Sequence, residues 1–363
     1  MLQSRKNKIF FACSGVGHIR RGYETHMIDL YDQLIAIPDL DLTLLKGGGK
    51  SQGKIKRIYC IQRHGYLANF ISKISGKPGY MIEQISFFLL TVYYIIVKKP
   101  DTIYSPDFTL LRLYVILKKL SGLKYKTIFC NGGNYKPPYY GIDIVQFILP
   151  QYANGIDFGS KVIIPHGFSD ERFTIKVDKN MLRNKFGLPL DKKILLSVGS
   201  LDVDWKRMDL IINEASLLKR EDLFIIIVGQ KGKFHHKIRT LLEAKFGSNY
   251  RICESDPFSI WEYYKLADIF CLASLNETFG MVYVEALLSE IPIIAHNYFV
   301  AQEVLSEFCH YVDLTKEGNL AVELQKVLNK GSKYNLGNGR EFGIAKYSWK
   351  SIKPDYLKML LLE

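Results

Sequence analysis

The chain has 363 residues, of which 48% are hydrophobic and 23% are charged, and its formal net charge is +13. This composition excludes disordered, collagen-like and low-complexity proteins, and the length predicts two domains. Residues 1–170 hold 22 Lys and Arg against 11 Asp and Glu, whereas residues 171–363 hold 27 against 25. The first half therefore carries +11 and the second +2, which indicates that the first half meets an anionic partner.

Short apolar runs alternate with amphipathic stretches along the chain, as in an α/β protein whose parallel strands are joined by helices. The runs are apolar throughout, which indicates strands buried on both faces. We expect strands at residues 8–12, 42–45, 102–104, 127–130, 162–164, 194–198, 224–228, 269–272 and 291–295. The two series meet near Pro165-His166-Gly167. We therefore predict Rossmann-like domains at residues 1–165 and 166–345, followed by a helix at 346–363 that returns to the first domain.

The stretch at residues 46–77 is strongly basic and contains no acidic residue. Its cations are Lys46, Lys50, Lys54, Lys56, Arg57, Arg63, Lys73 and Lys77. Such a run is either a solvated face or a surface that docks on an anionic membrane. The second interpretation predicts a peripheral protein at the inner face of the membrane.

The longest apolar stretch, residues 85–97, has 13 residues, whereas a membrane-spanning helix needs about 20. We interpret it as a buried helix of the first domain. The six cysteines are scattered, with no C-x-x-C pair and no histidine cluster at ligand spacing. This pattern predicts buried free thiols and a cytoplasmic location.

The second half opens with a strand that ends in Gly199 and Ser200, followed after a short loop by Lys206 and Arg207. Small residues after a strand let the backbone approach a phosphate, and the two cations offer charge-assisted hydrogen bonds to it. Taken alone, such a Lys-Arg pair is also common on a solvated face.

The loop between that strand and Lys206 also contains Asp202 and Asp204. This spacing formally matches a metal-binding pair. We interpret the two carboxylates as turn and capping groups instead, because they stand in a loop rich in opposite charge, and we predict no metal site.

Residues 271–295 are predicted to form a strand, a loop, a helix and a strand. Glu277 lies in the loop and Glu285 roughly two turns into the helix. The unpaired N–H groups and the dipole of the helix start favour an anionic or polar ligand there. The helix start is formed by Phe279, Gly280 and Met281. Glu277 can accept sugar hydroxyls and Glu285 ribose hydroxyls, although an N-cap and a surface residue are the alternative interpretations.

Together these motifs resemble the retaining glycosyltransferases of family four, also called glycosyl transferases group 1, which have the GT-B fold. The resemblance is close for residues 190–305 and weaker near 164–168 and 347–349. The first domain adds a glycine-rich loop, Gly15-Val16-Gly17-His18. The resemblance implies two Rossmann-like domains that face a central cleft, and a C-terminal helix that returns to the first domain.

The resemblance also implies a function. A hexosyltransferase of this kind moves a sugar from a nucleotide-diphosphate sugar, such as a UDP- or GDP-sugar, to an acceptor hydroxyl in glycan assembly, with retention and without a metal or other cofactor. Lys206 would neutralise the diphosphate, Glu277 and the amides of the following helix start would hold the sugar, and Glu285 would hold the ribose. The remaining donor contacts would come from Gly17, Gly199, Ser200 and Arg207, and the acceptor-side candidates are His18 and Asn131.

Three positions depart from the family pattern. The family usually has Arg where Ser200 stands, so Arg207 or the arginines at positions 20 and 21 would have to substitute. Many members have a His after the strand 127–130, where Asn131 is the candidate replacement. A small residue is usual where Glu290 stands. These departures leave open a catalytically weak or regulatory nucleotide-sugar-binding protein.

Other functions fit the residues less well. Gly47-Gly48-Gly49-Lys50-Ser51 imitates a phosphate-binding P-loop, but Leu44 stands where the motif requires its first glycine. The glycines at residues 15–22 miss the spacing of a dinucleotide-binding oxidoreductase. The basic half lacks a nucleic-acid recognition motif, so no nucleic-acid partner is expected.

Overall fold

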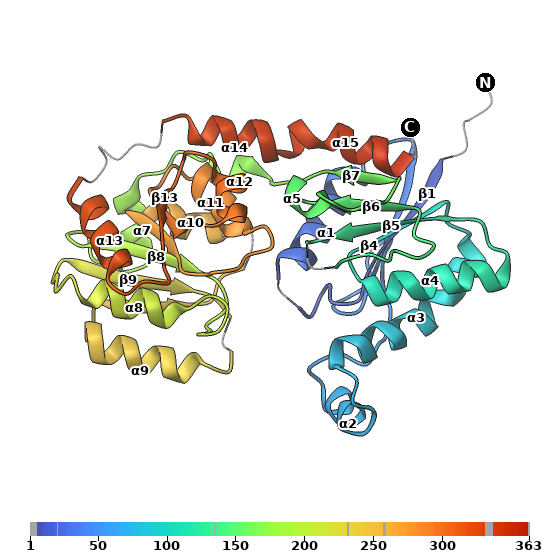
Figure 1. Cartoon of the computed structure of the whole chain (residues 1–363), viewed down its shortest axis with the longest axis horizontal. Coiled ribbons are helices and arrows are strands. Elements are labelled where there is room, and N and C mark those ends of the chain that lie inside the picture. Colours follow the sequence, from blue (N-terminus) through green and yellow to red (C-terminus); the bar gives the residue numbers. More distant parts are fainter. Residues whose placement is uncertain are drawn as a thin grey trace. The chain divides into compact units, whose positions relative to one another are not determined.

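The computed structural model describes residues 6–19, 21–133, 135–230, 232–256, 259–330 and 337–361. The chain divides into two compact units (Figure 1). Unit 1 comprises Met1–Phe168 and Trp349–Glu363, and unit 2 comprises Ser169–Ser348. The division after Phe168 lies three residues beyond the boundary expected from the sequence, and the contacts of the last helix place it in unit 1.

Unit 1 contains a parallel seven-stranded sheet with the order β3-β2-β1-β4-β5-β6-β7. Its strands are β1 (Asn7–Cys13), β2 (Leu40–Lys46), β3 (Ile55–Arg57), β4 (Thr102–Ser105), β5 (Lys126–Asn131), β6 (Ile144–Phe147) and β7 (Lys161–Ile163). Its helices are α1 (Gly22–Leu34), α2 (Tyr66–Ser75), α3 (Gly79–Lys98), α4 (Phe108–Ser121), α5 (Pro150–Ala153) and α15 (Trp349–Leu361).

Alternation along the strands assigns the two faces of this sheet. Phe10 on β1 and Phe129 on β5 belong to a core cluster that also contains side chains of α3 and α4. On the opposite face, Tyr104 donates a hydrogen bond to Gln146, which in turn donates one to Tyr356 on α15. Helices therefore cover both faces, which agrees with the continuous apolarity of the strands.

Helix α3 corrects the interpretation of residues 85–97. It has 20 residues, so it is longer than the apolar run, and it is the one described helix that is long and apolar enough to cross a membrane. Only a third of its most apolar stretch is buried inside the protein. Its inner face packs on α4, whereas Leu89 and Tyr93 are 64% and 67% exposed. The helix is therefore not the buried core element that we expected.

Unit 2 contains a parallel six-stranded sheet with the order β10-β9-β8-β11-β12-β13. Its strands are β8 (Lys193–Val198), β9 (Leu223–Val228), β10 (Tyr250–Cys253), β11 (Ile269–Leu272), β12 (Ile293–His296) and β13 (His310–Val312). Its helices are α6 (Asp170–Phe173), α7 (Lys179–Lys185), α8 (Met208–Ser216), α9 (His235–Phe246), α10 (Ile260–Leu266), α11 (Met281–Leu288), α12 (Phe299–Leu305), α13 (Asn319–Lys330) and α14 (Gly339–Tyr347).

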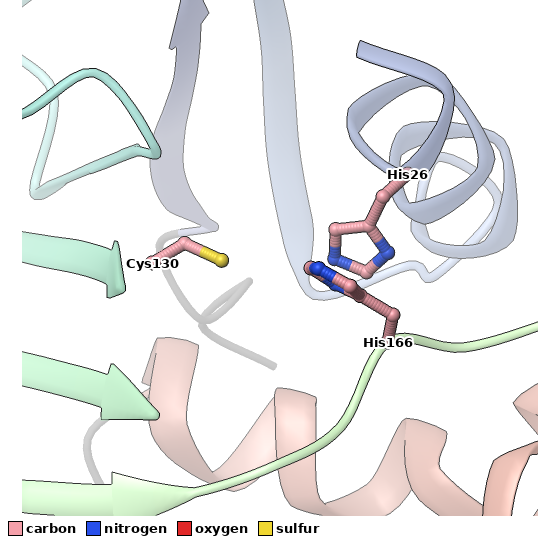
Figure 2. Close-up of side chains that lie close together, drawn as sticks. All are labelled: His26, Cys130 and His166. Carbon is pink, nitrogen blue, oxygen red and sulfur yellow. The ribbon is translucent and has the colours of Figure 1, made fainter. Parts of the chain in front are cut away.

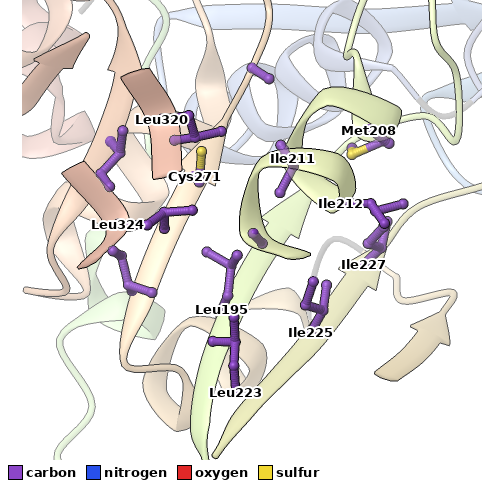
Figure 3. Close-up of a cluster of buried hydrophobic side chains, with 14 of the residues drawn as sticks. Leu195, Met208, Ile211, Ile212, Leu223, Ile225, Ile227, Cys271, Leu320 and Leu324 are labelled. Carbon is purple, nitrogen blue, oxygen red and sulfur yellow. The ribbon is translucent and has the colours of Figure 1, made fainter. Parts of the chain in front are cut away.

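The core of unit 2 lies between its sheet and two of its helices. Figure 3 shows Leu195, Ile225 and Ile227 on the strands facing Ile211 on α8 and Leu324 on α13. Each of these side chains is at most 1% exposed. This packed face holds β8, β9 and α8 in place, and with them the loops at the carboxyl ends of the strands.

Four strands were not predicted, namely β3, β6, β10 and β13. Three of them are sheet edges, where one side of the strand needs no apolar neighbour and polar residues are tolerated. The fourth, β6, lies inside the sheet but carries Gln146, which is fully buried and satisfied by hydrogen bonds. The hydrogen-bond partners of the Gln146 side-chain amide come from distant segments. In the sequence, this polar residue interrupts the apolar run by which a strand is predicted.

Both sheets reverse their strand order at one point. In unit 2 the chain runs outward from β8 through β9 to β10, and then returns to place β11 on the other side of β8. In unit 1 the same reversal places β4 beside β1. Loops diverge from the carboxyl ends of the strands at such a switch point, and ligands of open α/β sheets bind there.

Asp268 joins three elements of unit 2 just before β11. Its carboxylate accepts hydrogen bonds from Arg183 at 2.6 Å, from the Ile194 amide at 2.7 Å and from Lys179 at 3.0 Å. Burial alone would raise the pKa of Asp268, but the charge of Lys179, the Ile194 amide and Arg183 outweigh it and hold that pKa below its usual value. The network ties α7 to the central strands.

We expect Asp268→Asn to lower the free energy of unfolding by about 3 kcal/mol at pH 7, because the buried Arg183 guanidinium loses its counter-charge. The lowered pKa means that the ionised carboxylate stabilises the fold above about pH 4, and that this contribution is lost as the pH falls through the lowered pKa. The stability difference between wild type and variant should therefore shrink in acid, as measured by chemical denaturation.

The matched control is Asp222→Asn, which removes an aspartate that is also paired with an arginine but is 46% exposed. Its loss should cost less than about 1 kcal/mol. Equal effects of the two substitutions would contradict the structural role assigned to Asp268.

Candidate active site

The two residues predicted to carry the chemistry meet at the switch point of unit 2. Lys206 follows β8 and Glu277 follows β11, and these strands are neighbours in the sheet. The Lys206 ammonium and the Glu277 carboxylate form an ion pair. Their side chains are 21% and 13% exposed, so the pair is shielded but open to a ligand. The fold thus joins two residues 71 positions apart in the sequence.

Asp202 shapes the loop that carries Lys206. Its carboxylate accepts hydrogen bonds from the Trp205 amide at 2.9 Å and the Lys206 amide at 2.6 Å, and also from the Ser200 hydroxyl. Its backbone carbonyl accepts from the Met208 amide, where α8 begins. Asp202 is therefore a turn group, as the sequence predicted. Its contacts determine where the Lys206 side chain leaves the backbone.

Two glycines bring the ends of β8 and β9 into contact. A Cβ atom on Gly229 would lie 1.7 Å from the Gly199 carbonyl oxygen, so only glycine fits there. A Cβ on Gly199 would touch the Lys206 side chain at 3.1 to 3.3 Å. The Lys206 stem therefore lies directly over Gly199. From the sequence alone, no role was assigned to Gly229. Its position directly after the predicted strand 224–228 could have indicated that it belongs to the site.

Helix α11 begins at Met281, and Gly280 is its N-cap residue with φ of 75°. A Cβ on Gly280 would lie 2.4 Å from the Tyr283 ring, so both the backbone conformation and the space require glycine. The Phe279 side chain is only 2% exposed and contacts the Tyr347 ring edge-on at 5.7 Å. Phe279 therefore anchors the loop, and only its backbone can serve the site as predicted.

Glu285 lies on α11 with its carboxylate fixed from α10. The Tyr264 hydroxyl donates a hydrogen bond to it at 2.7 Å. Tyr264 is fully buried, and burial together with the Glu285 charge raises the pKa of this tyrosine well above its usual value. The hydroxyl therefore stays protonated and orients one carboxylate oxygen. Tyr264 is a second residue that sequence reasoning missed.

The predicted substitute for the family arginine is engaged elsewhere. The Arg207 guanidinium donates a hydrogen bond to the Leu314 carbonyl at 3.2 Å, beyond β13. Ser200, at the usual arginine position, donates to Asp202. Of the two alternative arginines, the one at position 20 lies outside the described residues, and Arg21 is the N-cap residue of α1 in unit 1. Lys206 is therefore the cation that the described part of unit 2 directs toward Glu277.

In unit 1, the glycine-rich loop after β1 packs against the glycines that follow β2. A Cβ on Gly17 would lie 2.4 Å from the Gly48 carbonyl oxygen, and Gly17 has φ of 94°. The Gly48 amide donates a hydrogen bond to the Val16 carbonyl at 2.9 Å. The P-loop-like glycines thus serve a close packing of two loops, in which Gly17 supports the neighbouring His18.

His18 belongs to a buried charge network. Its Nε2 lies 2.9 Å from a carboxylate oxygen of Glu83, and Arg63 pairs with the other oxygen at 2.6 Å. Burial opposes ionisation of Glu83, but the hydrogen bonds from His18 and Arg63 outweigh it and hold its pKa at about 2. The His18 Nδ1 atom is buried and has no hydrogen-bond partner among the described residues. His18 is thus held in one orientation.

Two further carboxylates lie near this network at the switch point of unit 1. Asp107 accepts hydrogen bonds from the amide and hydroxyl of Ser14, which ties the end of β4 to the end of β1. Glu24 on α1 is 6% exposed, and its Oε2 atom has no hydrogen-bond partner in the described structure. Burial raises the pKa of both carboxyl groups. Sequence reasoning missed Asp107 and assigned no role to Glu24.

Asn131 is used within its own loop. Its Nδ2 donates to the Tyr135 carbonyl at 2.8 Å and to the Tyr139 hydroxyl at 3.0 Å, and its Oδ1 accepts from the Gly133 amide at 3.0 Å. The side chain is fully buried. Its predicted acceptor contact would require this loop to rearrange.

Cys130 is a buried free thiol, as predicted, and lies beside two histidines that are distant from it in the sequence. Figure 2 shows it near His26 and His166, and the ligand atoms of the three residues lie within 4.8 Å of one another. The centroids of the two imidazole rings lie 4.1 Å apart with the rings tilted by 48°, and His26 Nε2 lies 3.2 Å from the Tyr356 hydroxyl. Burial lowers the pKa of His26 well below its usual value and that of His166 to about 3, so both are neutral. These contacts are those of a packed structural cluster.

This cluster explains the Pro165-His166-Gly167 motif. The Tyr356 hydroxyl donates to the Pro165 carbonyl at 2.9 Å, and a Cβ on Gly167 would lie 2.4 Å from the Trp349 ring. Residues 165–167 therefore form part of the surface on which α15 packs in unit 1.

We expect Gly229→Ala to displace the Gly199 loop, because the added methyl group would overlap the Gly199 carbonyl oxygen. The strain should lower stability by about 1–3 kcal/mol. Thermal unfolding measures this loss. Gly232→Ala is the control, because a Cβ there would meet nothing closer than the Leu201 carbonyl oxygen at 3.7 Å. A Gly229→Ala protein as stable as the control would contradict the close approach.

Comparisons with known proteins find a family model that matches part of this chain. Residues 178–335 match the family model of glycosyl transferases group 1. Alpha-monoglucosyldiacylglycerol synthase of Streptococcus pneumoniae is 28% identical over 176 residues, which are 46% of this chain and 38% of that protein. Across the matching curated relatives, the aligned region covers 34% to 43% of their length.

Solved structures match over the whole chain. Sucrose-phosphate synthase from Thermosynechococcus elongatus superimposes with a TM-score of 0.79 at 18% identity, covering 98% of this chain and 99% of that one. HepE from Anabaena, in complex with UDP-glucose, has a TM-score of 0.74 at 14% identity and covers 98% of this chain and 100% of its own. The expected fold is therefore confirmed: this chain has the GT-B fold, and most of its unit 2 matches the family model of glycosyl transferases group 1.

Proposed function

We propose that this protein transfers a sugar from a nucleotide-diphosphate sugar to an acceptor hydroxyl, as a retaining enzyme of family four that needs no metal or other cofactor. The observation that carries the proposal is the Lys206–Glu277 pair at the switch point of unit 2. A cation and a carboxylate side by side match the two parts of such a donor, an anionic diphosphate and a polyhydroxyl sugar.

In the proposed reaction the diphosphate draws the Lys206 ammonium away from Glu277. The bond between the sugar C1 and the diphosphate oxygen breaks, and negative charge develops on that oxygen. The ammonium and the backbone amides at the start of α11 stabilise this charge. A new bond forms from the acceptor oxygen to C1 on the same face, and the acceptor proton passes to the departing diphosphate oxygen.

The sugar and the ribose are assigned to the two glutamates. Glu277, released from the ion pair, accepts hydrogen bonds from sugar hydroxyls. Glu285, oriented by Tyr264, accepts hydrogen bonds from the ribose hydroxyls. The complex of HepE with UDP-glucose supports a nucleotide-sugar donor. Retention is supported by the alpha product in the name of the pneumococcal relative, because retention converts an α-linked donor into an α-linked product.

We further propose that the acceptor is membrane-borne or lipid-linked, and that the protein works peripherally at the cytoplasmic face of the membrane in glycan assembly. The acid-free basic stretch 46–77 lies in unit 1, and each cation near an anionic surface contributes about 1 kcal/mol to binding. The name of the pneumococcal relative, which specifies a glucosylated diacylglycerol, supports a lipid acceptor. No nucleic-acid partner is proposed.

A second function is a regulatory nucleotide-sugar-binding protein with weak or no turnover. It is favoured by two observations: Arg207 donates a hydrogen bond to the Leu314 carbonyl, and Ser200, bonded to Asp202, stands where the family usually has an arginine. Such a protein would bind UDP- or GDP-sugars without releasing the nucleoside diphosphate, whereas the enzyme releases it.

We expect Lys206→Ala and Glu277→Ala each to lower turnover at least about 10²-fold, because each removes a group that stabilises the developing charge or holds the sugar. The measurement is release of nucleoside diphosphate in a screen of UDP- and GDP-sugars. Thermal unfolding checks that both variants remain folded.

Lys316→Ala is the matched control, because this lysine of unit 2 is 73% exposed and pairs with an aspartate, Asp313. Its turnover should equal that of the wild type. Wild-type turnover in Lys206→Ala or Glu277→Ala would remove the role assigned to that residue, and donor binding without turnover in the wild type would support the regulatory function.

A further inference from the structure

Helix α2 turns its apolar side chains outward. Tyr66, Leu67, Phe70 and Ile74 are 87%, 51%, 51% and 72% exposed. At about 100° per residue, these four positions fall within an arc of about 100° on one side of the helix. The inward side carries the fully buried Ala68. Helices on the surface of a water-soluble domain show the opposite pattern, with the large apolar residues facing the core.

Helix α3 carries a second exposed apolar row. Leu89, Tyr93, Ile96 and Val97 are 64%, 67%, 47% and 53% exposed and follow one another at helical spacing. Figure 1 shows α2 beyond α3, on the side of α3 that faces away from the sheet of unit 1, and the two helices are in contact. Exposed apolar side chains are therefore grouped on two neighbouring helices. On most protein surfaces such residues are scattered singly.

The charges around these helices have one sign. Residues 46–100 hold ten Lys and Arg and one acidic residue, Glu83. Glu83 is fully buried and paired with Arg63, so it presents no negative charge to the surface. Lys73 lies on α2 and Lys77 directly after it, and both are exposed. A cationic surface with an apolar row on its outer helix is complementary to an anionic bilayer, whose headgroups are negative and whose interior is apolar.

Helix α3 does not cross this bilayer in its folded position. The Glu83 carboxylate is buried with Arg63 and His18 near the helix start, and Thr91 bonds to the Tyr114 hydroxyl of α4 at 2.9 Å. These contacts hold α3 against unit 1. The surface therefore suits a helix that lies in the headgroup region and not one that spans the membrane.

We propose that α2 is an interfacial helix that inserts Tyr66, Leu67, Phe70 and Ile74 into an anionic phospholipid bilayer, with Lys73 and Lys77 contacting the headgroups. The inference deepens the proposed function, because a membrane-bound acceptor would then be reached from the surface. It predicts that apolar insertion, and not charge alone, holds the protein on the membrane.

The test is sedimentation with vesicles of phosphatidylcholine, with and without 30% phosphatidylglycerol, at roughly physiological salt. The wild type should partition at least about 10-fold more strongly onto the anionic vesicles. The double variant F70S/I74S should lower that partitioning at least about 10-fold, since it removes two inserted side chains. The double variant K73E/K77E should lose the preference for anionic vesicles.

The matched control is L217S/V322S, which removes two apolar residues of unit 2 that are 54% and 56% exposed. It should bind vesicles like the wild type. Thermal unfolding should be unchanged in all variants, because every substituted side chain is exposed. The proposal is overturned if the wild type does not bind anionic vesicles, if F70S/I74S binds as well as the wild type, or if gel filtration shows that α2 instead joins two copies of the chain.

Release of nucleoside diphosphate from donor sugars separates this proposal from the proposed function. F70S/I74S should keep wild-type donor hydrolysis in the absence of vesicles, because neither residue is among the assigned donor contacts. Vesicle binding without donor hydrolysis would contradict the enzymatic function and leave the interfacial helix in place. Donor hydrolysis without vesicle binding would contradict the interfacial helix and leave the enzymatic function in place.

Discussion

The reversal of strand order at β8 and β11 is the constraint on which the candidate site depends. Parallel strands end at one edge of the sheet, and the loops of these two neighbours must diverge because the chain leaves them in opposite directions. Lys206 and Glu277 sit on those two loops and form an ion pair. The close approach of Gly199 and Gly229, and the turn held by Asp202, then position the lysine.

The same constraint operates in unit 1 with a different chemical result. Its switch point between β1 and β4 gathers the carboxylates Asp107, Glu24 and Glu83 with Arg63 and His18. Buried charges are costly unless they are paired. Hydrogen bonds from Arg63 and His18 keep the pKa of Glu83 at about 2, whereas burial raises the pKa of Glu24 and Asp107. Unit 1 therefore holds a polar centre of its own.

The number of charged residues in unit 1 did not by itself indicate which way the apolar sides of its helices face. The basic run 46–77 was evident in the sequence, but apolar residues of α2 and α3 were ambiguous, because an amphipathic helix has the same spacing whether its apolar side faces a core or a membrane. Burial of Ala68 and exposure of Phe70 decide the orientation. Likewise, the apolar run 85–97 suggested a core helix until the packing of α3 on α4 showed which side was covered.

The sequence by itself determined the alternation of strands and helices, the glycine-rich turns, and the residues on the loops of unit 2, because these follow from local periodicity and short-range spacing. Only the tertiary structure decided which distant groups meet. It brought Cys130 beside His26 and His166, gave Glu285 its Tyr264 partner, used the Asn131 amide within its own loop and turned Arg207 toward Leu314. These pairings depend on strand order and helix packing, which act between segments far apart in the chain and leave no local pattern in it.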